Sequence, residues 1–160
     1  GWLASALANG APQWRGDRAA ALKRARARLA TARVDGVDWY WPADERIRRA
    51  QPSERLRLLA PFDPVVWDRR RFELFWGWAY RIEAYTPAKK RVRGYYALPL
   101  LWREAVIGWA NLSVQGGRLI HEIGFVSGRA PRGAEFRREL ERELDAMRGF
   151  LGLGGSSANG

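Results

Sequence analysis

The sequence predicts an α+β chain, in which helices flank an antiparallel β-sheet or small barrel. Three patterns support this class. Apolar residues recur at helical spacing in 17–31 and 133–151. From Tyr80 onward, side chains alternate with a period of two, as in strands with one buried face. The pairs Asp35-Gly36 and Gly116-Gly117 separate β-prone runs, where they favour tight hairpin turns.

The first part of the chain, residues 1–57, predicts a basic helix and a hairpin. Asp17 can cap a helix that runs to about Thr31. The pair Asp35-Gly36 then joins two short strands, 32–34 and 37–42. A helix followed by such a hairpin is the pattern of the end of a winged-helix module, with the hairpin as its wing. In the polar, basic segment 43–57 we expect a short helix and a linker at the domain boundary.

The second part, residues 58–152, predicts a β-rich domain closed by a C-terminal helix. A short strand is expected at 58–60, and Asp68 can cap a short helix that Gly77 ends. About four strands, enough for a curved sheet or small barrel, follow as a meander. They are expected at 80–85, 95–102, 105–115 and 118–126. Residues 133–151 predict the closing helix, and 153–160 a flexible tail.

Composition restricts the class of protein. At 160 residues the chain is one domain, or one domain plus part of another. It has no cysteine, which excludes disulfides and zinc thiolate sites. It has a single histidine, His121, so the sequence does not predict a metal site. No apolar run reaches the roughly 18 residues of a membrane span, and residues 1–5 do not resemble a signal peptide. We therefore expect a cytoplasmic monomer without metal, cofactor or membrane partner.

The charge points to a polyanionic partner. The formal net charge is +11, and it is unevenly distributed. Up to Arg93 there are 20 basic and 10 acidic residues, an excess of +10, whereas the remainder has 8 and 7, an excess of +1. A genome rich in arginine codons is the alternative explanation, but such a bias would spread the excess evenly. The uneven charge therefore predicts contact with nucleic acid.

Two basic segments are the candidate binding sites. Four cations precede a tyrosine in the first, where a hairpin tip could contact phosphates while the tyrosine stacks on a base or sugar. The second follows Asp68 on a short helix, whose three consecutive arginines cannot share one face. A solvated surface is the alternative for both. The candidate nucleic-acid-binding residues are Lys89, Lys90, Arg91, Arg93 and Tyr95, with Arg69, Arg70 and Arg71.

No residue is assigned a catalytic role. Asp63 lies between two prolines, where a carboxylate more often accepts backbone N–H hydrogen bonds in a turn than performs chemistry. Glu83 and Glu104 have no visible partner residues for acid–base catalysis.

A set of motifs runs through residues 34–115. These are A-P-F-D-P at 60–64, V-V-W-D-R at 65–69, Y-R-I-E-A-Y-T-P-A at 80–88, K-R at 90–91, G-Y at 94–95 and L-P-L-L at 98–101. In order and spacing they resemble the YcaQ-like, AlkZ-related family of winged-helix DNA glycosylases. The resemblance implies tandem winged helices that form a concave DNA-binding scaffold, a β-rich C-terminal domain, and removal of alkylated bases or unhooking of interstrand crosslinks.

The chain departs from that family at the catalytic motif. The family carries a glutamine, an apolar residue and then glutamine or aspartate near the start of a chain more than twice as long. Gln13-Trp14-Arg15 lacks the third member. We therefore expect a C-terminal portion that binds double-stranded DNA but is inactive alone. The alternatives are a non-catalytic winged-helix nucleic-acid-binding module and a protein-interaction domain with a basic face.

Overall fold

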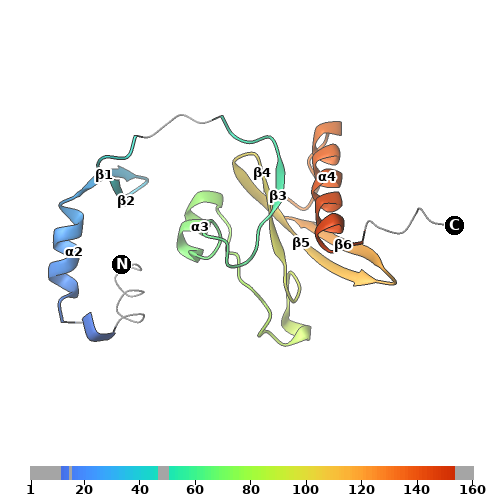
Figure 1. Cartoon of the computed structure of the whole chain (residues 1–160), viewed down its shortest axis with the longest axis horizontal. Helices are drawn as coiled ribbons and strands as arrows, with labels where there is room; N and C mark the ends of the chain where they lie inside the picture. Colours follow the sequence, from blue (N-terminus) through green and yellow to red (C-terminus); the bar gives the residue numbers. More distant parts are fainter. Residues whose placement is uncertain (1–11, 15, 47–50, 154–160) are drawn as a thin grey trace. The chain divides into compact units, whose positions relative to one another are not determined.

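The computed structural model describes residues 12–14, 16–46 and 51–153, and the chain divides into two compact units, Gly1–Ala50 and Gln51–Gly160 (Figure 1). The first unit contains a short 3-10 helix η1 (Pro12–Trp14), helix α2 (Arg18–Arg26) and strands β1 (Leu29–Val34) and β2 (Val37–Pro42). The second contains β3 (Leu56–Leu58), α3 (Arg69–Trp76), η2 (Ala88–Lys90), β4 (Leu98–Trp102), β5 (Ala105–Gln115), β6 (Arg118–Phe125) and α4 (Ala134–Phe150).

The predicted helix and hairpin of the first unit are both present, but the boundary between them is different. Helix α2 ends at Arg26, because residues 29–31 pair with β2 and lengthen the first arm of the hairpin. Asp35 and Gly36 both have positive φ angles, of 49° and 76°, as a tight hairpin turn requires. Asp17 occupies the N-cap position of α2, although its side chain makes no capping hydrogen bond.

The second unit is built on an open, antiparallel four-stranded sheet in the order β3-β4-β5-β6. The predicted strands 105–115 and 118–126 are confirmed, the second ending one residue early at Phe125, and 95–102 is shortened to β4. The sheet does not close on itself, so the barrel alternative is wrong. The described parts of 43–57 contain no helix, and the first strand starts at Leu56 rather than Leu58. The tail beyond Leu153 lies outside the described residues.

The predicted strand at 80–85 is wrong, and the reason is visible in the side chains. Three alternate aromatic residues donate side-chain hydrogen bonds to backbone carbonyls of the sheet region. The indole nitrogen of Trp76 donates to the Glu104 carbonyl at 3.0 Å and that of Trp78 to Val106 at 2.9 Å. The Tyr80 hydroxyl donates to the Ala97 carbonyl at 2.7 Å. Residues 80–85 pair with no strand among the described residues, and Tyr80 and Glu83, which an alternating pattern places on opposite sides, are both buried.

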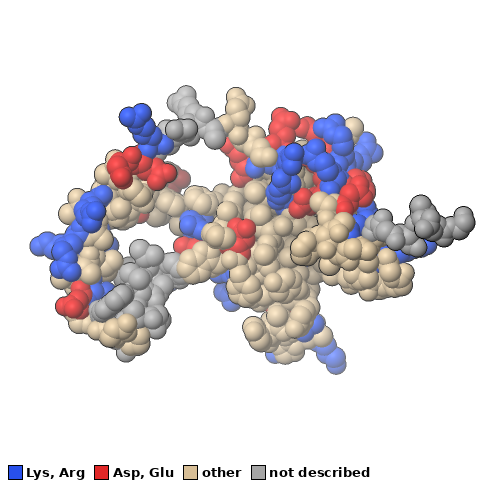
Figure 2. Space-filling view, in the orientation of Figure 1, with Lys and Arg blue, Asp and Glu red and all other residues tan. Residues whose placement is uncertain are grey.

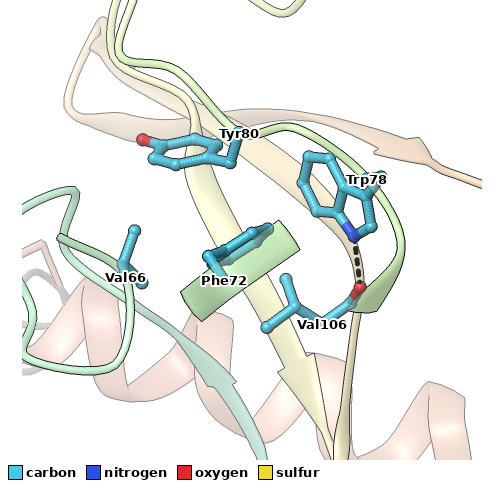
Figure 3. Close-up of a cluster of buried hydrophobic side chains, with 5 residues drawn as sticks. All are labelled: Val66, Phe72, Trp78, Tyr80 and Val106. Carbon is cyan, nitrogen blue, oxygen red and sulfur yellow. Dashed lines mark hydrogen bonds between the residues drawn. The ribbon is translucent and has the colours of Figure 1, made fainter. Parts of the chain in front are cut away.

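The sheet has a hydrophobic cluster on each face. One contains Val66, Phe72 of α3, Trp78, Tyr80 and Val106 of β5 (Figure 3). Phe72 is fully buried and meets Trp78 edge-on, with ring centroids 5.0 Å apart. The other cluster lies under α4, where Phe136 packs with Leu56 and Leu100. Neighbouring residues of β4 serve the two faces alternately, as the pleat requires: Leu100 faces α4, and Leu101 packs on the α3 side.

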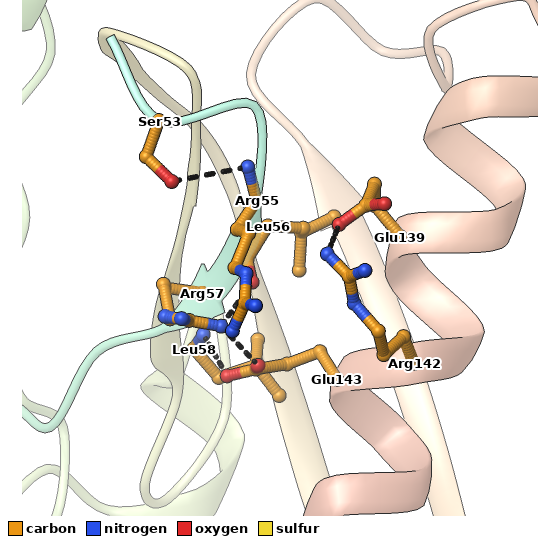
Figure 4. A network of polar contacts seen from close by, with 8 residues as sticks. All are labelled: Ser53, Arg55, Leu56, Arg57, Leu58, Glu139, Arg142 and Glu143. Carbon is orange, nitrogen blue, oxygen red and sulfur yellow. Dashed lines mark hydrogen bonds and ion pairs between the residues drawn. The ribbon is translucent and has the colours of Figure 1, made fainter.

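Helix α4 also fixes the short edge strand β3 through a carboxylate (Figure 4). Glu143 accepts a hydrogen bond from the backbone N–H of Leu58 at 2.8 Å and one from the Arg57 guanidinium at 3.3 Å. On the same helix, Glu139 is buried and pairs with Arg142. Glu143 of α4 therefore holds the first strand of the sheet in place.

Candidate nucleic-acid interface

Helix α3 presents its three arginines in three different environments. The Asp68 carboxylate caps the helix by accepting a hydrogen bond from the Arg71 N–H at 3.2 Å, and Gly77 ends it in the left-handed conformation with φ of 69°, both as predicted. Arg69 donates to the carbonyls of Val66 at 3.0 Å and Pro61 at 3.3 Å. These bonds keep the Arg69 guanidinium against the protein.

The other two arginines of α3 differ in whether their guanidinium groups have a hydrogen-bond partner among the described residues. The Arg71 guanidinium donates to the Pro64 carbonyl. Arg70 is exposed and has no hydrogen bond or ion pair with any residue that the structure describes. As the sequence predicts, the three side chains point in different directions, and Arg70 is the one that can reach a partner without breaking a contact.

Asp63 has the structural role that the sequence favours. Its carboxylate accepts a hydrogen bond from the Val65 N–H at 2.8 Å, and its carbonyl accepts from the N–H groups of Val66 and Trp67. The Pro-Phe-Asp-Pro segment is therefore a hydrogen-bonded turn that leads into α3.

The second basic segment extends away from the sheet between α3 and β4 (Figure 1). It is not a hairpin tip, because residues 80–85 do not form a strand; a turn of 3-10 helix, η2, carries Lys89 and Lys90 instead. Both lysines are exposed and have no partner within the described part of the chain. In the space-filling view, Lys and Arg atoms show at this end of the second unit (Figure 2).

Arg91 and Arg93, in contrast, are bound into the segment itself. The Nε of Arg91 donates to the Thr86 carbonyl at 2.8 Å, and its guanidinium lies 5.0 Å from the ring centroid of Tyr95, which is 59% exposed. The Arg93 guanidinium lies 5.0 Å from the ring of Trp78 and 5.4 Å from that of Trp109. Such cation–π contacts are worth about 0.5–2 kcal/mol each, more when water is excluded.

A buried carboxylate organises the backbone of this segment. Glu83 is 8% exposed, and its Oε2 accepts hydrogen bonds from three successive backbone N–H groups. The donors are Val92 at 2.9 Å, Arg93 at 2.8 Å and Gly94 at 3.1 Å. Successive N–H groups that converge in this way form an anion-binding concavity, here filled by the protein's own carboxylate.

The three hydrogen bonds decide the ionisation of Glu83. Burial by itself raises the pKa of a carboxyl group, but the backbone N–H groups of Arg93, Val92 and Gly94 outweigh it and hold the pKa of Glu83 below its ordinary value. Because this pKa is lower in the folded than in the unfolded protein, the carboxylate stabilises the fold at neutral pH. That contribution is lost as the pH falls below the ordinary range of a glutamate.

Tyr80 connects the two basic segments. Its ring lies 4.7 Å from the Arg69 guanidinium, and its hydroxyl is anchored on the Ala97 carbonyl. Burial raises the pKa of Tyr80 to about 12, against the opposing effects of Arg69 and Arg93. The phenol is therefore neutral at physiological pH, and it acts here as a packing and hydrogen-bonding group.

Sequence reasoning missed the residues that hold the interface together. It gave Glu83 no partners, because the alternation in 80–85 places this residue opposite Tyr80 and Ile82, on the solvent side. A turn at 84–85 instead follows Glu83 in the structure. The sequence also did not indicate that the Arg93 guanidinium packs against Trp78 and Trp109. The available signal was a single acid within a strongly basic segment that ends in a glycine.

Two surface cavities lie elsewhere on the second unit. One, with a volume of about 580 Å³, is lined by Ile107, Phe125 and the exposed arginines Arg129 and Arg132, among others. The other, of about 340 Å³, is mainly apolar and includes Met147. Among the described residues that line them, neither cavity has a carboxylate.

The described residues contain no cluster of three or more His, Cys, Asp or Glu that could bind a metal ion. In the same residues, no helix is long and apolar enough to cross a membrane.

The model of a family described as "DNA glycosylase AlkZ-like" matches residues 5–150 of the chain. No solved structure matches.

Proposed function

The chain belongs to the AlkZ-like DNA glycosylase family, and on this premise we propose that it is the DNA-binding portion of a repair glycosylase for alkylated bases or interstrand crosslinks. The family match confirms the resemblance that the sequence motifs predict. Membership by itself implies DNA repair and DNA binding. The lesion class, and the location of the catalytic residues outside this DNA-binding chain, are proposals.

The observation that carries the proposal is the contrast among the cations of the two basic segments, 69–71 and 89–93. Arg69, Arg71, Arg91 and Arg93 are held by carbonyls or aromatic rings of the same unit. Lys89, Lys90 and Arg70 are exposed and have no partner among the described residues. Free cations on an ordered scaffold suit phosphate contacts, which position DNA without reading its sequence.

Tyr95 adds a second kind of contact. Its ring is 59% exposed and carries the Arg91 guanidinium on one side. An exposed aromatic ring beside phosphate-binding cations can stack on a base or a sugar. We propose that the segment 88–95 combines the two contacts, with the lysines as point charges and Tyr95 as the stacking group.

We also propose that α2 and the β1–β2 hairpin form the end of a winged-helix module. Arg26 at the end of α2 lies 5.4 Å from the ring of Tyr40 on β2, so the helix and the hairpin contact each other. Arg33 and Asp38 form an ion pair across the hairpin at 3.8 Å. Arg15, which precedes Asp17 in the sequence, lies outside the described residues.

The residue that activates the attacking water is proposed to lie outside this chain. Cleavage of a glycosidic bond needs a general base beside an extruded lesion base. Gln13 of η1 is exposed but is followed by Trp14 and Arg15, without the glutamine or aspartate that the family motif requires. The buried carboxylates Glu83 and Glu139 are engaged in hydrogen bonds.

Duplex DNA binding is expected to be strongly salt-dependent and largely independent of sequence. If Lys89, Lys90 and Arg70 each neutralise one phosphate, they alone contribute about −2.7 to the slope of log affinity against log salt. Titration of two unrelated duplexes across a range of salt concentrations measures this slope. A flat slope would favour a protein-interaction domain, and tight binding to one duplex only would contradict positioning through phosphates.

The chain alone is expected to release no base. Incubation with duplexes that carry N7-alkylated purines or a nitrogen-mustard crosslink should give no abasic product above the rate without protein. Clear turnover by the wild-type chain would place the catalytic group within this chain and overturn the proposal that it lies outside.

A further inference from the structure

We propose that Glu83 is a positioning residue of the DNA interface, which holds the segment 88–95 in its binding conformation before DNA arrives. The inference rests on the proposed function for its DNA-binding part. The anchoring itself rests only on geometry: a buried carboxylate receives the N–H groups of Val92, Arg93 and Gly94 within 3.1 Å.

Contacts from β5 fix the same backbone from the other side. The Asn111 side-chain amide donates to the Arg93 carbonyl at 2.6 Å, so the residue at the centre of the three N–H groups is bound through both backbone groups. Its guanidinium lies near Trp78 and Trp109. The Arg93 Nε is buried, which removes this nitrogen from contact with a phosphate.

Gly94 makes this close approach possible. Its φ is +122°, a conformation that L side chains rarely adopt, and a Cβ at this position would lie 2.3 Å from the Asn111 amide oxygen. The anchored stretch 92–94 lies between the exposed lysines and Tyr95. Because its backbone is fixed on both sides, the lysines and the tyrosine are presented together.

Order in the free protein raises affinity, because a segment that is already fixed loses less conformational entropy on binding. Glu83 is therefore an acidic residue that favours DNA binding, although its charge by itself opposes it. If the charge of Glu83 acted only by repelling DNA, its removal would tighten DNA binding. If Glu83 positions the segment 88–95, its removal weakens DNA binding.

The test uses two variants and a matched control. Glu83→Gln removes the charge that the three N–H groups require. Gly94→Ala disturbs the same backbone without changing any charge. Glu73→Gln, on the exposed face of α3, makes the same charge change as Glu83→Gln away from the anchored segment.

Two measurements are made on each protein. The first is the rate of tryptic cleavage after Lys89 and Lys90, followed by mass spectrometry. The second is the affinity for duplex DNA at one salt concentration. For Glu83→Gln and Gly94→Ala we expect cleavage at least tenfold faster and affinity at least tenfold weaker, about 1.4 kcal/mol. For Glu73→Gln we expect wild-type cleavage and equal or slightly tighter binding.

Each outcome has one meaning. Unchanged cleavage in both variants would show that the segment does not depend on this anchor and would overturn the proposal. If the two variants were cleaved faster but bound DNA as tightly as the Glu73→Gln control, the order of the segment 88–95 would not matter for DNA binding. That result would also overturn the proposal. Failure of the wild-type chain to bind DNA would refute the proposed function and leave only the anchoring standing.

Hydrogen exchange in the wild-type protein provides a test that does not depend on any variant's folding. The amides of Val92, Arg93 and Gly94 lie outside helix and strand, yet we expect them to exchange as slowly as those of β5. Rapid exchange at all three would contradict the anchor directly.

Discussion

Replacing Phe72 with alanine is expected to lower the free energy of unfolding of the second unit by about 3–5 kcal/mol. The side chain is fully buried between α3 and the sheet. Its ring contacts Trp76, Trp78 and Tyr80 with centroid distances of 4.6–5.6 Å. Truncation leaves a cavity at the point where these rings meet, and a rigid aromatic cluster refills such a space poorly. Urea titration of the variant against wild type measures the loss.

Phe150→Ala is the matched control for this core prediction. It removes the same side chain from the end of α4, where the ring is 85% exposed. We expect a change within about 0.5 kcal/mol. If the two variants were equally stable, the cluster around Phe72 would not be the core of the second unit. Other contacts would then have to hold α3 and Tyr80 against the sheet.

Replacing Lys89 and Lys90 together with alanine is expected to weaken duplex DNA binding at least tenfold, about 1.4 kcal/mol, with an unchanged melting temperature. Both side chains are exposed and make no contact within the described residues, so little packing is lost. Arg93→Ala should behave differently. Its guanidinium contacts Trp78 and Trp109, so we expect both stability and affinity to fall.

Arg129→Ala combined with Arg132→Ala controls for net charge. Both arginines are exposed and line a cavity at the loop between β6 and α4, and their removal changes the net charge by the same two units. We expect a much smaller effect on DNA affinity than for the lysine pair. Equal losses in the two double variants would mean that total charge, and not the segment 88–95, governs binding.

Local signals in the sequence predicted much of the fold. Asp68 and Gly77 bound α3 as capping rules require, and Gly116-Gly117 joins β5 to β6. Local signals failed where contacts with residues distant in sequence determine the backbone conformation. Residues 29–31 have helical spacing but form a strand, because β2 offers them a partner. Residues 80–85 alternate like a strand, but Tyr80 and Glu83 are held by side-chain hydrogen bonds, which no period in the sequence reveals.

The candidate interface was predictable in outline only. Clustering of cations identified the two basic segments, because charge density can be read directly from composition. Which cations are free depends on carbonyls and rings brought close by folding: Arg91 and Lys90 are neighbours in sequence, yet only Arg91 is bound to the Thr86 carbonyl. The anchor, Glu83, stands out in the sequence only as a single acid within a strongly basic segment, and its partners could not be identified because they are backbone groups that have no sequence signature.

The salt dependence of the Lys89→Ala/Lys90→Ala variant tests the central claim most directly. If both lysines neutralise phosphates, the slope of log affinity against log salt should be shallower than that of wild type by about 0.9 for each lysine, roughly 1.8 in all. The Arg129→Ala/Arg132→Ala control should retain the wild-type slope. Parallel slopes for the lysine variant and wild type would contradict the account, because they would show that the segment 88–95 does not touch the DNA backbone.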